Sequence, residues 1–155
     1  MKPKIDVRIQ TNDFDIGSEI GVLKKNQFEI GAVTVFIGLV RDLSEKKDLR
    51  YMDLEHYPGM TEKALEDICN EAAQRWKISG LTVIHRVGRL FPGDNIVLVL
   101  VSSKHRGDAY NSNEFIMDFL KSNAPIWKKE TSKVGSYWVG ARTSDIDSLK
   151  AWIKS

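Results

Sequence analysis

The stretch KHRGDAYNSNEFIMDFLKSNAPIWKKE, residues 104–130, decides how this chain folds. It begins where an apolar strand ends, passes through a helical segment and closes on an extended run after Pro125. Its cationic side chains and one histidine lie at the borders of these elements, where binding and catalytic sites are usually built. These border residues are Lys104, His105, Arg106, Lys121, Lys128 and Lys129.

The middle of the stretch predicts a helix over residues 108–120 with one buried side. Asp108 is expected to cap its start, and Lys121 falls in the last turn, where the helix dipole favours a cation. Pro125 excludes Ala124 from helical geometry and so ends the helix. The apolar stripe consists of Ala109, Ser112, Ile116 and Leu120, with Phe115 and Phe119 beside it.

The extended run after Pro125 predicts that Lys121 and Lys128 can face one pocket. In a strand, Ile126, Lys128 and Glu130 share one face, whereas Trp127 and Lys129 share the other. Two ammonium groups held close disfavour each other's charge, so one amine can act as a base or a nucleophile. The alternative is that both lysines belong to a solvated face that protects an edge strand, and the pattern alone leaves both interpretations open.

The composition is that of an ordinary globular protein, expected to form a single domain over residues 1–155. The net charge of +2, from 23 Lys and Arg against 21 Asp and Glu, does not indicate general nucleic-acid binding. A lone Cys69, expected in the core, excludes an internal disulfide and a cysteine-based metal or redox pair. We expect a cytoplasmic protein, because no membrane-spanning run or signal-like segment stands out.

The rest of the chain mixes strands and helices without strict alternation, which predicts an α+β fold with a mixed, largely antiparallel sheet. The turn at Phe91-Pro92-Gly93-Asp94 predicts a hairpin. Gly80 is expected to end the second helix, and Ser144 to cap a last helix whose Ile146, Leu149 and Ile153 face inward. Strands are expected over residues 4–10, 30–40, 50–57, 81–90, 95–103 and 136–139, and further helices over 13–25 and 61–76.

The chain contains none of the familiar nucleotide-binding or hydrolase motifs, and no metal or cofactor is expected. His56 and His85, both within strands, are interpreted as packing or hydrogen-bonding residues. His105 and Arg106 precede a helix, where backbone N–H groups and a guanidinium can hold an anion, although an ion pair is an equal alternative for Arg106. With Arg41, which closes a strand, and Arg142, they could form a pocket for a small phosphate or carboxylate.

These residues occur in motifs that resemble the family of the large, catalytic subunit of molybdopterin synthase. The resemblance covers nearly the whole chain and implies the family's α/β hammerhead fold. It also implies a homodimer within a heterotetramer, with one small ubiquitin-like sulfur-carrier subunit at each end. The motifs are GLVR (38–41), LEHYPGMT (54–61), VIHRVG (83–88), PGD (92–94), SKHR (103–106), FIMD (115–118), and Lys121 followed by APIWKKE (124–130).

The resemblance implies transfer of two sulfurs from the carrier's C-terminal thiocarboxylate to cyclic pyranopterin monophosphate, giving the dithiolene of molybdopterin. Lys121 and Lys128 would be the catalytic pair. Lys104 departs from the family pattern, where a small residue is expected. Substrate would be bound by these two lysines together with Leu39, Val40, Arg41, His105, Arg106, Lys129, Glu130 and Arg142.

Two other functions compete with this one. A non-catalytic module could dock a carrier tail or a small anion in the same basic pocket and would need Lys121 only as a charge. An RNA-binding domain could use the basic face with Trp127 and Tyr137, but the net charge is low and these aromatics follow core patterns. Neither nucleic acid nor membrane is expected as a partner.

Overall fold

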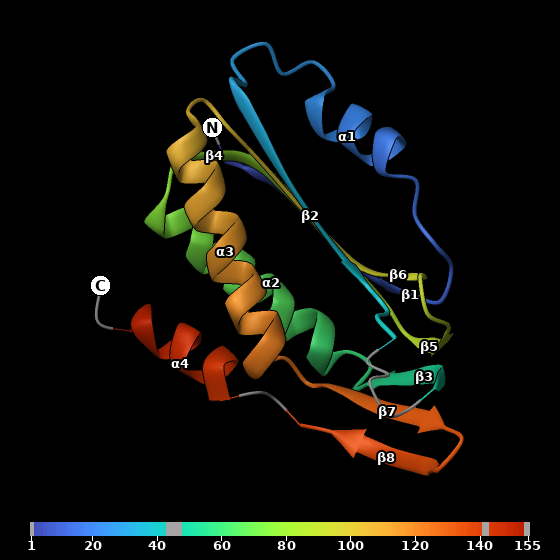
Figure 1. Cartoon of the computed structure of the whole chain (residues 1–155). Helices are drawn as coiled ribbons and strands as arrows, with labels where there is room; N and C mark the ends of the chain where they lie inside the picture. Colours follow the sequence, from blue (N-terminus) through green and yellow to red (C-terminus); the bar gives the residue numbers. More distant parts are fainter. Residues whose placement is uncertain (1, 43–47, 141–142, 154–155) are drawn as a thin grey trace.

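The computed structural model describes residues 2–42, 48–140 and 143–153, which form two four-stranded sheets and four helices (Figure 1). Sheet A has the order β1 (Lys4–Gln10), β4 (Ile78–Arg86), β6 (Asn95–Ser103), β2 (Ala32–Leu39). Sheet B has the order β5 (Gly88–Leu90), β3 (Leu49–His56), β7 (Ile126–Ser132), β8 (Gly135–Val139). The helices are α1 (Ile16–Lys24), α2 (Met60–Arg75), α3 (Arg106–Ser122) and α4 (Thr143–Ala151).

The expected α+β class is confirmed, since only the β1–β4 pair is parallel among the described strand pairs. Helices α2 and α3 cover one face of sheet A, and α1 covers the other (Figure 1). Strands β4 and β6 are therefore buried on both faces, which is why they are almost continuously apolar. Sheet B extends from one end of this layered core (Figure 1).

The expected antiparallel pairing with residues 95–103 is present, but the strand predicted over residues 81–90 is two strands in different sheets, and the two strands that flank the 91–94 turn do not pair with each other. β4 pairs with β6 in sheet A, whereas β5 pairs with β3 in sheet B. The break falls at Val87 and Gly88, and Gly88 has a φ of 91°, which an L residue rarely adopts. This turn carries the chain from one sheet into the other.

Two helix boundaries differ from the prediction. α3 begins at Arg106 with His105 as N-cap, so Asp108 lies in the first turn, where the dipole still favours its charge. α2 ends at Arg75, and Gly80 lies inside β4. A Cβ at Gly80 would come within 2.7 Å of a Leu23 methyl carbon, so the glycine allows α1 to pack closely.

The last helix also differs from the prediction. Ser144 lies inside α4, and Ile146 and Ile153 are 39% and 77% exposed. Leu149 is half-buried. The inward contact comes instead from Trp152, whose ring meets those of Trp76 and Phe115 edge-on and whose Nε1 donates to Asp118 at 2.7 Å. An aromatic ring that also carries a donor replaces the isoleucines as the anchor.

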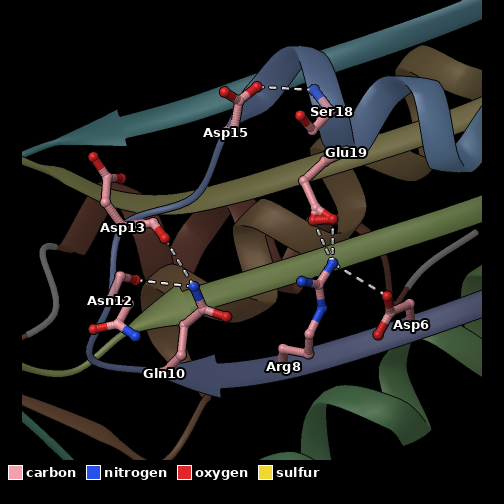
Figure 2. Close-up of polar contacts among 8 residues, drawn as sticks. All are labelled: Asp6, Arg8, Gln10, Asn12, Asp13, Asp15, Ser18 and Glu19. Atoms are coloured by element: carbon pink, nitrogen blue, oxygen red, sulfur yellow. Dashed lines mark hydrogen bonds and ion pairs between the residues drawn. The ribbon is translucent and has the colours of Figure 1, made fainter.

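Charged contacts hold α1 near the edge of sheet A (Figure 2). The Arg8 guanidinium on β1 donates to Glu19 on α1 at 2.6 Å and lies 3.2 Å from Asp6. Asp15 caps the helix by accepting from the Ser18 N–H at 2.9 Å. The apolar residues of α1 are thereby directed onto the β4–β6 face.

Cys69 is fully buried in α2, and burial raises the pKa of its thiol to about 12. The prediction that it is a core residue is confirmed. Within residues 2–42, 48–140 and 143–153, no helix is long and apolar enough to cross a membrane. Nor does this part of the chain hold a group of three or more His, Cys, Asp or Glu residues suited to a metal ion.

Gly31 ties the start of β2 to the segment that leads into α3. Its N–H donates to the Ser103 carbonyl at 2.9 Å. A Cβ at this position would lie only 2.2 Å from the carbonyl oxygen of Lys104. The backbone of the β6–α3 connection can approach this closely only because residue 31 has no side chain.

We expect Gly31→Ala to destabilise the fold by roughly 1–3 kcal/mol, because the alanine methyl would displace backbone rather than a flexible side chain. Gly21→Ala is the matched control, since a Cβ there meets nothing within 4 Å inside α1. Helix propensity predicts that the control is stabilising by up to about 1 kcal/mol. Urea denaturation of both variants measures the difference, and equal stabilities would contradict the close approach.

Candidate functional site

Four elements meet where α3 ends: the end of β3, the start of α2, the end of α3 and the start of β7 (Figure 1). The buried hydroxyl of Thr61 joins them. It accepts from the Tyr57 N–H at 2.9 Å and donates to the Pro125 carbonyl at 2.9 Å. One side chain therefore fixes the β3–α2 turn against the α3–β7 turn.

The register of β3 and β7 decides which way Lys128 faces. Leu54 lies opposite Lys128, and His56 lies opposite Ile126. Because opposite residues of an antiparallel pair share a face, Lys128 lies on the same face as the buried Leu54 and as His56. The predicted shared face of Ile126, Lys128 and Glu130 agrees with this register.

A buried histidine marks the centre of the site. His85, near the end of β4, is 5% exposed, and its Nδ1 lies 2.8 Å from the Arg86 carbonyl oxygen. Burial lowers the pKa of His85 to about 4, opposed by this backbone contact. The charges of Lys128, Lys121 and His56 lower it further. These three residues therefore lie within electrostatic reach of His85, and we call His56, His85, Lys121 and Lys128 the basic cluster.

The basic cluster places two amines beside a neutral imidazole. Lys121 is exposed in the last turn of α3, whereas Lys128 is half-buried on β7. An amine can bind an anion, transfer a proton or attack a carbonyl, depending on its protonation state. The arrangement thus supplies anion binding and proton transfer from two separate elements.

Lys129 and Glu130, which were also predicted as binding residues, lie on opposite faces of β7. Glu130 is 5% exposed, and its carboxylate accepts from the Tyr137 hydroxyl at 3.1 Å. Lys129 lies on the other face, with its amine 5.8 Å from the ring centre of Trp138 on β8. The strand therefore keeps Glu130 on the face of Lys128 and directs Lys129 away from it.

The predicted segment Leu39 to Arg41 begins at the last residue of β2, at the end of sheet A. Val40 is buried, its N–H donates to the Asp94 carbonyl at 2.9 Å, and its carbonyl accepts from Gly93 at 2.8 Å. Leu39 and Arg41 are exposed on either side of it. The Phe91–Asp94 turn thus holds the backbone from which the Arg41 guanidinium projects.

His105 and Arg106 lie at the opposite end of α3 from Lys121 (Figure 1). At 1.5 Å per residue, the fifteen positions from Arg106 to Lys121 span about 22 Å. Both residues are exposed, and Arg106 forms no ion pair with any residue that the structure describes. One chain therefore does not bring them to the basic cluster. Arg142, also predicted, lies outside the described residues.

The sequence predicts packing or hydrogen bonding, and no site role, for His56 and His85. Their burial fits that interpretation, but both also lie beside the predicted lysines. Strand position alone did not reveal this, because the approach of β3 and β4 to the α3–β7 turn is a tertiary contact. The signal available was the occurrence of each histidine close to the end of its strand.

The neutral state of His85 predicts a loss of stability in acid. An unfolded imidazole titrates near pH 6.5, whereas folded His85 has a pKa of about 4. The contribution of neutral His85 to the free energy of unfolding is complete above pH 6.5. It is lost as the pH falls from 6.5 towards 4, by about 3 kcal/mol in total. Urea denaturation over this pH range measures the loss.

The control for this prediction is His85→Gln, which keeps a hydrogen-bonding amide but cannot titrate. We expect the free energy of unfolding of this variant to depend less on pH between 6.5 and 4, while other groups titrate as before. Identical pH profiles for the two proteins would contradict a buried neutral histidine.

Comparison with known proteins shows the family of this chain. Residues 9–123 match the family described as MoaE protein. The molybdopterin synthase catalytic subunit of Ralstonia nicotianae is 53% identical over 94% of this chain and 83% of its own length. That of Haemophilus influenzae is 52% identical over 96% of this chain and 98% of its own.

The structure of the molybdopterin biosynthesis MoaE protein from Burkholderia ambifaria superposes with a TM-score of 0.82 at 51% identity, covering 96% of this chain and 97% of that one. Both the fold and the family expected from the sequence are thereby confirmed. The chain belongs to the MoaE protein family, the family of molybdopterin synthase catalytic subunits.

Proposed function

We propose that this chain is the sulfur-transferring subunit of a molybdopterin synthase. It takes sulfur from the C-terminal thiocarboxylate of a small ubiquitin-like carrier subunit and delivers it to cyclic pyranopterin monophosphate, giving the dithiolene of molybdopterin. The observation that carries the proposal is that Lys121 and Lys128, from two separate elements, both lie within electrostatic reach of the neutral His85. Relatives named catalytic subunits support a further subunit as partner.

Lys121 and Lys128 are the proposed catalytic residues. An amine can accept the carrier's acyl group, or give and take protons while sulfur leaves the thiocarboxylate. The chain has no sulfur donor of its own, since its one thiol, on Cys69, is buried and protonated. Sulfur must therefore come from a partner, as a carrier thiocarboxylate would provide.

The proposed substrate-binding residues come from two copies of the chain. Lys121, Lys128 and Glu130 belong to the basic cluster or the strand face beside it, whereas His105 and Arg106 lie about 22 Å along α3. A homodimer that places this end of α3 against the partner's basic cluster would complete the anion site. Further binding residues are proposed as Leu39, Val40, Arg41, Lys129 and Arg142.

The proposed location is the cytoplasm. A single buried cysteine gives the fold no disulfide, and such chains suit a reducing compartment. The substrate and the carrier would be met there.

We expect Lys121→Arg and Lys128→Arg each to lower dithiolene formation by about 100-fold or more, because arginine keeps the charge but cannot exchange a proton near neutral pH. The measurement is single-turnover dithiolene formation from the thiocarboxylated carrier and the cyclic pterin. Omission of the carrier should abolish product.

The matched control is Lys63→Arg, which changes an exposed lysine of α2 that pairs with Asp67 at 3.0 Å. Its rate should equal that of the unmodified protein. Undiminished product formation in both Lys121→Arg and Lys128→Arg would favour a module that needs these residues only as charges.

A mixing experiment tests the two-copy site. Lys121→Met and Arg106→Ala homodimers should each be nearly inactive. After subunit exchange, mixed dimers contain one site with both native residues, so about a quarter of the unmodified activity should return. No recovery despite demonstrated exchange would contradict the contribution of Arg106 from a second copy.

A further inference from the structure

We propose that His56 and Glu62 form a proton relay for Lys128, in which His56 takes a proton from the Lys128 ammonium and Glu62 stabilises the resulting imidazolium. The inference rests on the proposed function, and it concerns two residues that the sequence patterns placed in no site. His56 ends β3, and Glu62 lies in the first turn of α2.

The strand register brings His56 to Lys128. His56 is opposite Ile126, and Leu54 is opposite Lys128, so His56 and Lys128 are diagonal neighbours on one face of sheet B. Such neighbours lie about 7–8 Å apart at their backbones, within reach of a lysine side chain and an imidazole. Both side chains are half-buried, which keeps the path between them partly shielded from water.

The geometry of Glu62 gives its two oxygens different roles. Oε2 accepts from the Gly59 N–H at 2.8 Å and so fixes the start of α2. Oε1 lies 3.6 Å from Nε2 of His56 and is buried, with no hydrogen-bond partner in the part of the chain that the structure describes. A buried carboxylate oxygen without a donor is unfavourable unless a charge forms beside it, and an imidazolium at His56 would supply that charge.

His56 lies beside a carboxylate of α2 and near the cations of two other elements. Glu62 on α2 favours the imidazolium. Lys128 on β7 and Lys121 at the end of α3 are the cations on the other neighbouring elements, and both act on His85 of β4, which is neutral above its pKa of about 4. When Lys128 gives up its proton, one opposing charge disappears as the imidazolium forms. The transfer therefore creates an ion pair with Glu62 and leaves no positive charge on Lys128 to repel the imidazolium.

The step needs no other reactant. One N–H bond of the Lys128 ammonium breaks, its electron pair stays on Nζ, and a new N–H bond forms on the neutral imidazole. The free amine can then accept the carrier's acyl group or a proton from the pterin. The imidazolium later returns its proton to the amine or to the departing group, so the relay is regenerated.

Variants that keep the helix cap can separate a proton relay from a purely structural role of His56 and Glu62. Glu62→Gln retains a carbonyl oxygen for the Gly59 N–H but loses the charge beside His56. His56→Gln retains a polar side chain of similar length but cannot carry a proton. Asp67→Asn is the matched control, because it removes a carboxylate from an exposed ion pair of the same helix.

Single-turnover dithiolene formation should be measured against pH for these proteins. We expect His56→Gln to be about 100-fold slower with unchanged pterin affinity. Glu62→Gln should move the acid limb of the rate profile to lower pH by about one unit, because the imidazolium loses its counter-ion. Asp67→Asn should leave rate and profile unchanged. Added imidazole should partly restore the rate of His56→Ala.

A second readout needs no substrate and separates this inference from the proposed function. In NMR titrations, the His56 imidazole should titrate at lower pH in Glu62→Gln and at higher pH in Lys128→Met than in the unmodified protein. If the protein made no dithiolene, the proposed function would fail while this coupling could still be measured. Unshifted His56 titrations in both variants, or a His56→Gln rate and profile equal to the unmodified ones, would overturn the relay.

Discussion

The antiparallel register of β3 and β7 is the constraint on which the site depends. Because Leu54 lies opposite Lys128, the Lys128 side chain lies on the inner face of sheet B and not on its outer face. A shift by one residue would exchange Lys128 for Lys129 and direct the wrong lysine inward. The Thr61 hydroxyl, shared between the Tyr57 N–H and the Pro125 carbonyl, holds the ends of both strands where this register begins.

Much of the fold could be predicted from the sequence because apolar residues recur at clear strand and helix periods. The predictions for β1 and β6 match the structure to the residue, and that for α2 is shifted by one residue at each end, since alternation and a helical stripe are local properties. The break at Gly88 was missed because an apolar run does not show where a strand changes sheets. Likewise, the anchor of α4 is Trp152, whose partners Trp76 and Asp118 lie far away in the sequence.

The candidate site was predictable only in part for the same reason. The lysines at 121 and 128 stood out because a helix end and a proline-started strand adjoin in sequence. His85 and His56 come from strands that meet this corner only in the folded chain. Conversely, His105 and Arg106 lay near Lys121 in the motif, yet a 17-residue helix separates them in space. Proximity along a sequence is therefore a poor guide wherever a helix intervenes.

The electrostatics of the basic cluster favour an anionic occupant. Lys121 and Lys128 place two ammonium groups within electrostatic reach of His85. Burial keeps His85 neutral, so it does not add a third positive charge. The Glu62 carboxylate lies beside His56, and the Glu130 carboxylate already accepts a hydrogen bond from the Tyr137 hydroxyl. A pterin phosphate or a carrier thiocarboxylate would bring negative charge to these amines. Because His85 is neutral, it places a polar side chain beside the two amines without adding to the repulsion between them. Specificity for small anions can thus arise locally in a chain whose net charge is only +2.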